Sequence, residues 1–227
     1  MRLTVLLSLV TGCQLVFPLE GDRDPVTLRK TYLHDPGTTK RITLPLDPAV
    51  QLGDLLIVMI GARELDDIEI EELSPGWTLM AEEEAVMCPG QFHVSFLKTV
   101  VTPDTESESE IDFDVEGSMN VLVSVYTGAS DARLLDFKLM GNLQNEPALA
   151  FPEATLAPGS IAWFGGSALT PWSDIDAPVG TERIGAVAQL AAFQLPVRDG
   201  QLPEVVLPNQ RPLNEFCANV AQISVEP

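Results

Sequence analysis

The sequence predicts an all-β fold: an antiparallel β-sandwich of the jelly-roll or immunoglobulin-like kind, made of two similar halves. Its 16 glycines and 18 prolines are spread along 227 residues, and they interrupt almost every apolar run before it reaches a dozen residues. Frequent turns between short apolar runs are typical of many short strands rather than of helices. A hydrophobic content of 45% is sufficient for a substantial core.

The first half begins at Gly53-Asp54, a turn signal followed by the unbroken apolar run Leu55–Ile60. Such a run predicts a strand buried on both faces. A second turn at Pro75-Gly76 leads through Trp77 into another strand, where a buried indole is expected to join the core. The strand that follows, 92–101, alternates in polarity, and its His93 is expected to face away from the apolar side.

The end of the first half reads as two strands. Residues 111–116 alternate between apolar and acidic side chains, Gly117-Ser118 forms a predicted turn, and a second apolar strand closes on Tyr126. Residues 131–141 have no clean period and are predicted to form a short irregular or helical excursion.

The second half repeats the opening pattern. Gly159 again precedes an apolar strand, and the turn Pro178-Val179-Gly180 corresponds to the Pro75-Gly76 turn without its tryptophan. Features kept by both copies are those that a sandwich needs to fold. We therefore predict one β-sandwich domain over residues 45–227, with halves at about 45–130 and 155–227, because each half alone is small for an independent β core.

Residues 1–44 are predicted to form an extended N-terminal arm that contains an apolar strand. Its candidate partner-binding residues are Leu3, Val5, Leu7, Leu9, Arg23, Arg29 and Lys30. Residues 1–41 hold six basic and four acidic residues, a charge of +2, so the remainder carries −22 of the total of −20. A basic arm on an acidic body is expected to dock on something acidic, its own body included.

An alternative for the N-terminus is a signal peptide. The run after Arg2 is apolar, and Val10-Thr11-Gly12-Cys13 resembles a lipoprotein cleavage site, which would leave Cys13 lipidated. The charged region is a single arginine and the apolar run is short. An uncleaved strand is therefore favoured, and the run is too short to span a bilayer.

Charge and composition limit the chemistry. A net charge of −20 argues against a nucleic-acid partner. Three dispersed cysteines form neither a zinc motif nor a disulfide framework, and two histidines stand beside no nucleophile motif. We expect no catalytic residues and no cofactor.

Two weaker candidates for ligand contact remain. Asp112, Asp114 and Glu116 share one face of a predicted strand and are the candidate calcium ligands, although a charged face that is simply solvated is the competing interpretation. Trp172 lies between Pro171 and Ser173 in a loop and is a candidate contact for a host-surface glycan.

The succession Gly53-Asp54-Leu55-Leu56, Pro75-Gly76-Trp77-Thr78 and Tyr126-Thr127-Gly128 resembles a β-sandwich family of tailed-bacteriophage virion proteins. Members of that family decorate heads or form domains of tail fibres and other appendages, and their motif contains no active-site residues. The resemblance covers about residues 45–227.

The resemblance implies a non-enzymatic accessory subunit that decorates the capsid. Residues 1–44 are not covered by the resemblance, and this basic-leaning arm is our candidate for attachment to the major capsid protein or to neighbouring subunits, with a homo-oligomer expected. The alternatives are a tail-fibre or baseplate subunit, a lectin-like module, and a lipoprotein of the bacterial cell envelope.

Overall fold

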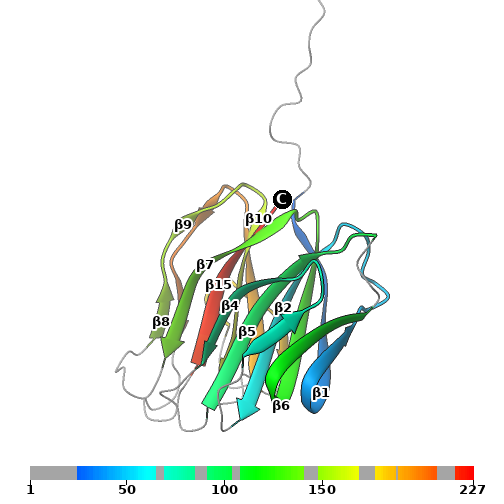
Figure 1. The fold of residues 1–227 in the computed structure, drawn as a ribbon. Helices are drawn as coiled ribbons and strands as arrows, with labels where there is room; N and C mark the ends of the chain where they lie inside the picture. Colours follow the sequence, from blue (N-terminus) through cyan, green and yellow to red (C-terminus); the bar gives the residue numbers. More distant parts are fainter. Residues whose placement is uncertain are drawn as a thin grey trace, which may run out of the picture.

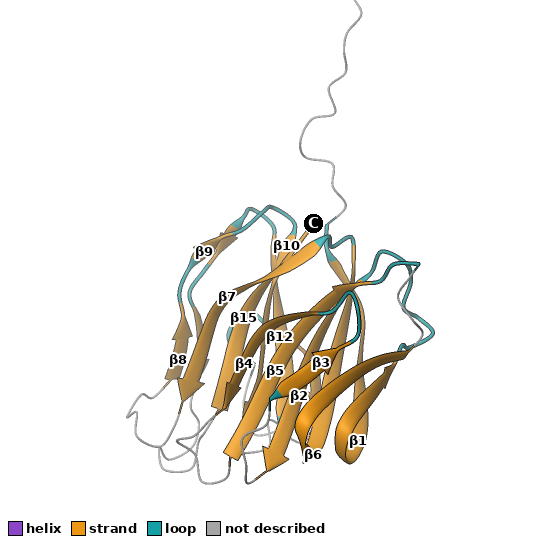
Figure 2. Ribbon diagram, in the orientation of Figure 1, coloured by secondary structure: helices purple, strands orange, loops and turns teal. Residues whose placement is uncertain are grey.

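A computed structural model describes residues 25–64, 69–84, 91–103, 108–140, 148–168, 177–187, 189–208 and 218–227. Every regular element in these ranges is a β-strand (Figure 2), so none of them holds a helix that could cross a membrane. The strands are β1 (Thr27–Pro45), β2 (Leu55–Glu64), β3 (Ile70–Leu73), β4 (Thr78–Glu84), β5 (Gln91–Val100), β6 (Glu108–Thr127), β7 (Asp131–Met140), β8 (Ala148–Phe151), β9 (Ala154–Thr155), β10 (Ser160–Ala168), β11 (Glu182–Val187), β12 (Leu190–Val197), β13 (Gln201–Leu202), β14 (Val205–Pro208) and β15 (Ala218–Glu226).

The two halves form two antiparallel sheets of the same strand order, which face each other as a sandwich (Figure 1). The first sheet has the order β1-β6-β2-β5-β4, with β3 added to β6, and the second has the order β7-β15-β10-β12-β11. Replacing each strand of the first half by its counterpart in the second converts one order into the other. The predicted antiparallel sandwich of two similar halves is confirmed.

Turn geometry gives the alignment of the two halves. The amide of Gly53 donates to Val101 at 2.7 Å, and the amide of Gly159 donates to Val197 at 3.0 Å. These glycines have φ of 84° and 85°, a left-handed conformation that residues with a Cβ rarely adopt. Both predicted strand-opening turns are therefore present.

The second pair of turns is aligned one residue differently from the sequence prediction. Trp77 N donates to Ser74 O at 3.3 Å, and Thr181 N donates to Pro178 O at 3.0 Å. Pro178 therefore corresponds to Ser74 rather than to Pro75, while Gly76 and Gly180 remain equivalent. Thr181 stands where the first half has Trp77.

Three apolar cores are stacked through the molecule. The central core lies between the sheets and holds the largest buried side chains, among them Phe96, Tyr126 and Trp163. The outer core of the first half lies behind β2 and includes Trp77. The outer core of the second half lies behind β10 and includes Phe151 and Phe164. Because the central core takes residues from both halves, neither half is complete without the other.

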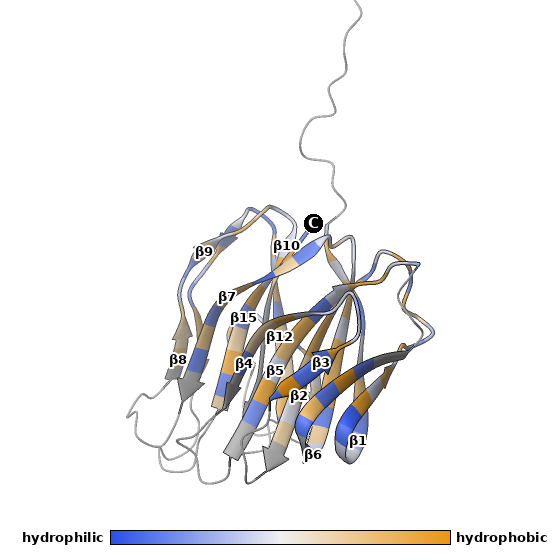
Figure 3. Ribbon diagram, in the orientation of Figure 1, coloured by the Kyte–Doolittle hydropathy of each residue, from blue (hydrophilic) through white to orange (hydrophobic). Residues whose placement is uncertain are grey.

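β1 and β6 are long strands that curl together over the outer core of the first half, at the right of Figure 1. Their register shifts between His34 and Gly37 and again between Thr39 and Arg41. Irregularities of this kind bend a strand pair. Beyond the bend, Ile42 and Leu44 pack in the outer core of the first half. Hydrophilic positions are more frequent along the curled strands than along the central strands of the sheet (Figure 3).

This curl corrects two predictions. Gly117-Ser118 is no turn, because both residues lie inside β6, opposite Thr38 and Thr39. The predicted arm of 1–44 is also too long, since Thr27–Pro45 is an integral strand of the first sheet. The proline and glycine signals at Asp35-Pro36-Gly37 mark the bend in this strand rather than a linker.

The predicted irregular excursion at 131–141 is wrong. Asp131–Met140 forms β7, which pairs with β15 at the edge of the second sheet. A register shift between Gln222 and Ile223 of β15 interrupts the pairing, and the alternation along β7 changes phase there. β7 is the counterpart of β1, and β8 and β9 continue it over the outer core of the second half.

Candidate binding site

A cavity of about 480 Å³ opens at the end of the sandwich where β2, β4 and β7 begin and β5 ends. We call it the end pocket. Its lining residues are Leu55, Pro75, Gly76, Thr78, Lys98, Thr99, Val100, Thr102 and Asp131. The Pro75-Gly76 turn singled out in the sequence therefore forms part of its wall, and Leu55, which follows the Gly53-Asp54 turn, also lines it.

Backbone geometry fixes the floor of the end pocket. Thr99 Oγ1 donates to the carbonyl oxygen of Gly76 at 2.9 Å, and Val101 N donates to Asp54 O at 2.8 Å. These bonds hold the Pro75-Gly76 turn and the start of β2 against the end of β5. Leu55 is buried beneath them, so the floor is apolar.

An ion pair that crosses between the sheets borders the end pocket. Lys98 Nζ donates to Asp131 Oδ1 and also to the carbonyl oxygen of Ala132, at 2.6 Å. The hydrogen bond from Lys98 holds the pKa of Asp131 below its usual range. No sequence pattern indicates this contact, because 33 residues separate its partners.

In the second half, the position that corresponds to Lys98 is Gln194, whose side chain points into the sandwich toward Tyr126. Glu182 and Gln194 stand opposite each other there as Thr78 and Lys98 do in the first half. Gln194 is buried, donates to Glu182 Oε2 at 3.2 Å and accepts from the Tyr126 hydroxyl at 3.4 Å. Burial, and secondarily the Glu182 charge, raises the pKa of Tyr126 well above its usual value. The two halves therefore differ at the position where the first half has its cavity.

A second polar cluster joins β3, β4 and β5. His93 Nε2 lies 3.0 Å from Glu82 Oε1 and 2.7 Å from Ser95 Oγ, and Ile70 N donates to the same glutamate oxygen at 3.0 Å. Burial alone would raise the pKa of Glu82, but the hydrogen bonds from His93, Ile70 and Ser95 outweigh it and lower the pKa. His93 faces away from the apolar side of its strand, as predicted, and it is buried there.

The His93 cluster does not have the geometry of a nucleophilic triad. The same ring nitrogen faces both the hydroxyl and the carboxylate, whereas a triad needs the acid on the opposite nitrogen. Ser95 also has no exposed surface to offer a substrate. The cluster ties the short strand β3 to the sheet.

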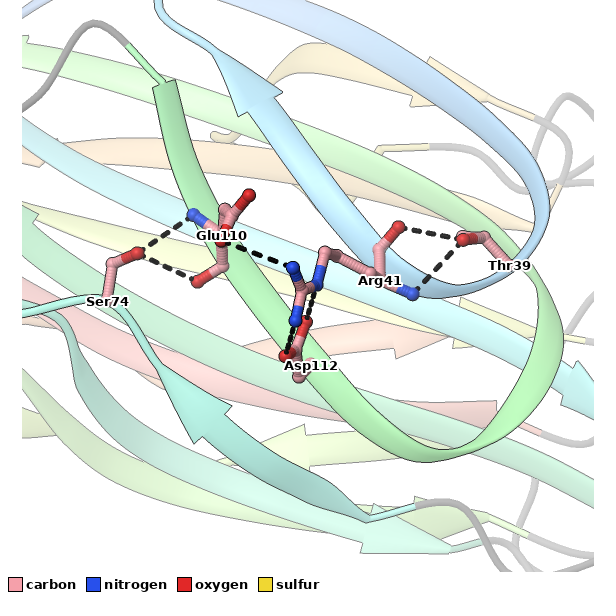
Figure 4. A network of polar contacts seen from close by, with 5 residues as sticks. All are labelled: Thr39, Arg41, Ser74, Glu110 and Asp112. Atoms are coloured by element: carbon pink, nitrogen blue, oxygen red, sulfur yellow. Dashed lines mark hydrogen bonds and ion pairs between the residues drawn. The ribbon is translucent and has the colours of Figure 1, made fainter.

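The candidate calcium ligands are spread along the curled part of β6, and Figure 4 shows Asp112 with its polar contacts. Both carboxylate oxygens of Asp112 accept hydrogen bonds from Arg41, each at 2.6 Å, and Glu110 lies 3.6 Å from the same guanidinium. Asp114 accepts from Glu69 N at 2.8 Å, and Glu116 is exposed. The described residues contain no group of three acidic, His or Cys side chains that could hold a metal. The contact with Asp112, above all through its hydrogen bonds, raises the pKa of Arg41.

Two of the predicted arm residues contact the acidic body of the same chain. Arg29 Nε lies 2.8 Å from Asp54 Oδ2, and Lys30 Nζ pairs with Asp47. The Lys30 contact, together with a backbone hydrogen bond from Ala49, lowers the pKa of Asp47. Arg29 and Lys30 of the basic segment therefore bind acidic residues of the same chain, one of the targets predicted for this segment.

The remaining predicted site residues lie outside the described ranges. They are Leu3, Val5, Leu7, Leu9 and Arg23 of the arm, Cys13, and the glycan candidate Trp172.

Comparison of the chain with protein-family models, with curated proteins and with solved structures found no match.

Proposed function

We propose that this chain is a non-enzymatic structural subunit of a tailed-phage virion, located on the particle surface. Its role there is to decorate or cement the capsid, and residues 1–24 attach it to the capsid protein or to a neighbouring copy. The same scaffold in a tail appendage is the alternative position.

The observation that carries the proposal is the role of the motif residues that suggested the family. Gly53 and Gly76 make turns that recur in the second half, while Trp77 and Tyr126 fill two of the cores. The motif therefore specifies a rigid scaffold. The His93 cluster, with its buried Ser95, is also unsuited to catalysis.

The position of β1 narrows the attachment segment to residues 1–24. Removing the whole predicted arm would also remove most of β1, leaving Asp54 and Asp47 without their basic partners. Pro25 and Val26 already contact the second sheet, where Val26 N donates to Gly159 O at 3.1 Å. A deletion that ends at residue 24 therefore leaves the described sandwich intact.

The test is a phage in which codons 2–24 of this gene are deleted. The truncated protein should fold with a melting temperature close to that of the full chain, because no described contact is lost, yet it should be missing from purified particles. Particles are analysed by quantitative mass spectrometry, with the full-length gene as control. Normal occupancy by the truncated protein would contradict the attachment role, and absence of the full-length protein from particles would contradict the virion assignment itself.

The same spectra give the copy number per particle of the full-length protein. A head-decorating subunit should be present in numbers comparable to the capsid protein, whereas a tail component is present in far fewer copies.

A further inference from the structure

The two sides of the sandwich are closed to different degrees. On one side, β11 lies close to β1 and β6, and a Cβ added at Gly185 would lie 2.8 Å from Thr31 Cγ2 and 3.1 Å from Leu122 Cδ1. On the other side, β5 and the edge strand β7 are joined by the Lys98–Asp131 ion pair and by an edge-to-face contact of Phe96 with Phe137, whose centroids are 6.0 Å apart, while β4 lies at the edge beyond β5. We call this second side the β4 side.

β4 has a free backbone edge. Within the described residues its backbone pairs with β5 alone, and its contact with β3 is made through the Glu82 side chain, so every second amide and carbonyl group of β4 points away from the sheet. Leu79 at its start is 38% exposed, and the end pocket opens beside it at Thr78. An edge of this kind is a template for an added strand, with the cavity as a site for an apolar side chain.

The chain itself has a segment suited to that edge. Residues 1–24 precede Pro25, and Leu3-Thr4-Val5-Leu6-Leu7-Ser8-Leu9-Val10 has the composition of a strand, with an apolar residue at each odd position. Val26 packs in the same core as Leu55 and Ala132, which begin β2 and β7 at the pocket end of the sandwich. The segment therefore departs from the end where the cavity opens.

Reach and direction both allow docking within one molecule. Residues 11–24 alone, when extended, cover roughly 45 Å, whereas a sheet of five strands is about 20–25 Å wide. A chain that arrives at the pocket end with Val10 and continues to Leu3 runs antiparallel to β4, which starts at that end with Thr78. All other strand pairs of both sheets are antiparallel.

Charge selects β4 over β7. Antiparallel addition brings Arg2 and the N-terminal amino group to the far end of β4, where the sequence reads Glu82-Glu83-Glu84. The far end of β7 has Lys138 instead, which lies 3.4 Å from Asp136 of the same strand, so no acidic run is present there. Opposite charges across adjacent strands stabilise pairing, and like charges oppose it.

We propose that residues 3–10 dock on their own sandwich as an antiparallel strand added to the free edge of β4, with Leu9-Val10 beside the end pocket. This inference does not depend on the virion assignment. In the purified protein this contact is made within one molecule, and only in an assembled particle is the same contact exchanged between neighbouring copies, as in domain swapping.

Hydrogen exchange of the purified full chain tests the proposal against the variant that lacks residues 2–24. Peptides covering 78–84 should exchange about tenfold more slowly in the full chain or better, because the outward amides gain partners. Peptides covering the β11 edge, 182–187, should be unchanged. Equal exchange of 78–84 in the two proteins, or protection that falls on 131–140 instead, would overturn the proposal.

Two substitutions of equal charge sharpen the test. Leu7→Asp places a carboxylate within the docking segment next to an acidic strand and should abolish the protection of 78–84. Thr11→Asp, outside the segment, should keep it. Both variants lie outside the described sandwich, so a retained melting temperature checks that they fold.

Concentration and intact mass complete the test. Protection that is the same at low and high protein concentration supports docking within one molecule, whereas protection lost on dilution, together with a dimer, would overturn it. A mature protein that begins at Cys13 would also overturn it, because the segment would be gone.

Discussion

Asp54 shows how one residue connects the sequence pattern to the fold. Its side chain is 2% exposed, it accepts a hydrogen bond from Gln51 N at 2.8 Å, and its other contacts are with Arg29 of β1. The second half has Ser160 at the equivalent position, also buried, with a hydroxyl that has no partner. The aspartate therefore occurs in the first half, where it pairs with Arg29 of the edge strand β1.

Replacing Asp54 by serine, the residue of the second half, should therefore cost about 3 kcal/mol of unfolding free energy, because a buried charge pair loses one partner. In an Arg29→Met background the same replacement should cost at least about 1 kcal/mol less, because contacting residues couple. Urea titrations of the four proteins of this double-mutant cycle measure both quantities. Additive costs would show that Arg29 is not held by Asp54.

At the scale of elements, sequence patterns correctly predicted the central, apolar strands, but they did not correctly predict the strands at the edges of the sheets. β2 and β10 were found from their apolar runs behind turn glycines. β1, β7 and the curled part of β6 were misread, because their burial is partial and register shifts interrupt their alternation. Turn residues such as Pro36-Gly37 were signals of a bend, which local sequence alone does not distinguish from a chain reversal.

Sequence patterns identified some residues of the candidate site but did not predict that these residues surround one cavity. The turns at Gly53 and Gly76 were identified, but Lys98 and Asp131 were not, because the cavity depends on how two sheets meet. The orientation of His93 was predicted from strand alternation, but its burial was not, because alternation says nothing about a layer, here β3 and the curled strands, that covers this face from outside.

The equivalence of the two halves predicts equal costs for two glycine substitutions. Gly53→Ala and Gly159→Ala should each cost about 1–2 kcal/mol, because each forces a side chain into a left-handed conformation, and neither Cβ would meet an atom closer than 3.6 Å. Gln51→Ala, at an exposed position of the same loop as Gly53, is the control and should be close to neutral. Chemical denaturation of the three variants gives the comparison. A cost at one glycine alone would mean that the two turns are not equivalent.

At the scale of the whole molecule, we predict that the two sheets form one folding unit rather than two domains. The outer cores each belong to one half, but the central core is shared, and its polar contacts also cross between sheets. Trp163 Nε1 of β10 donates to Ser124 Oγ of β6 at 3.3 Å. Separating the halves would expose the largest buried side chains of both, a loss of several kcal/mol for each aromatic residue.

Differential scanning calorimetry of the full chain tests this central claim most directly. One transition is expected, with a calorimetric enthalpy equal to its van't Hoff enthalpy, as for a single cooperative unit. Two separable transitions, each with roughly half of the total enthalpy, would contradict it and would show that each half folds on its own.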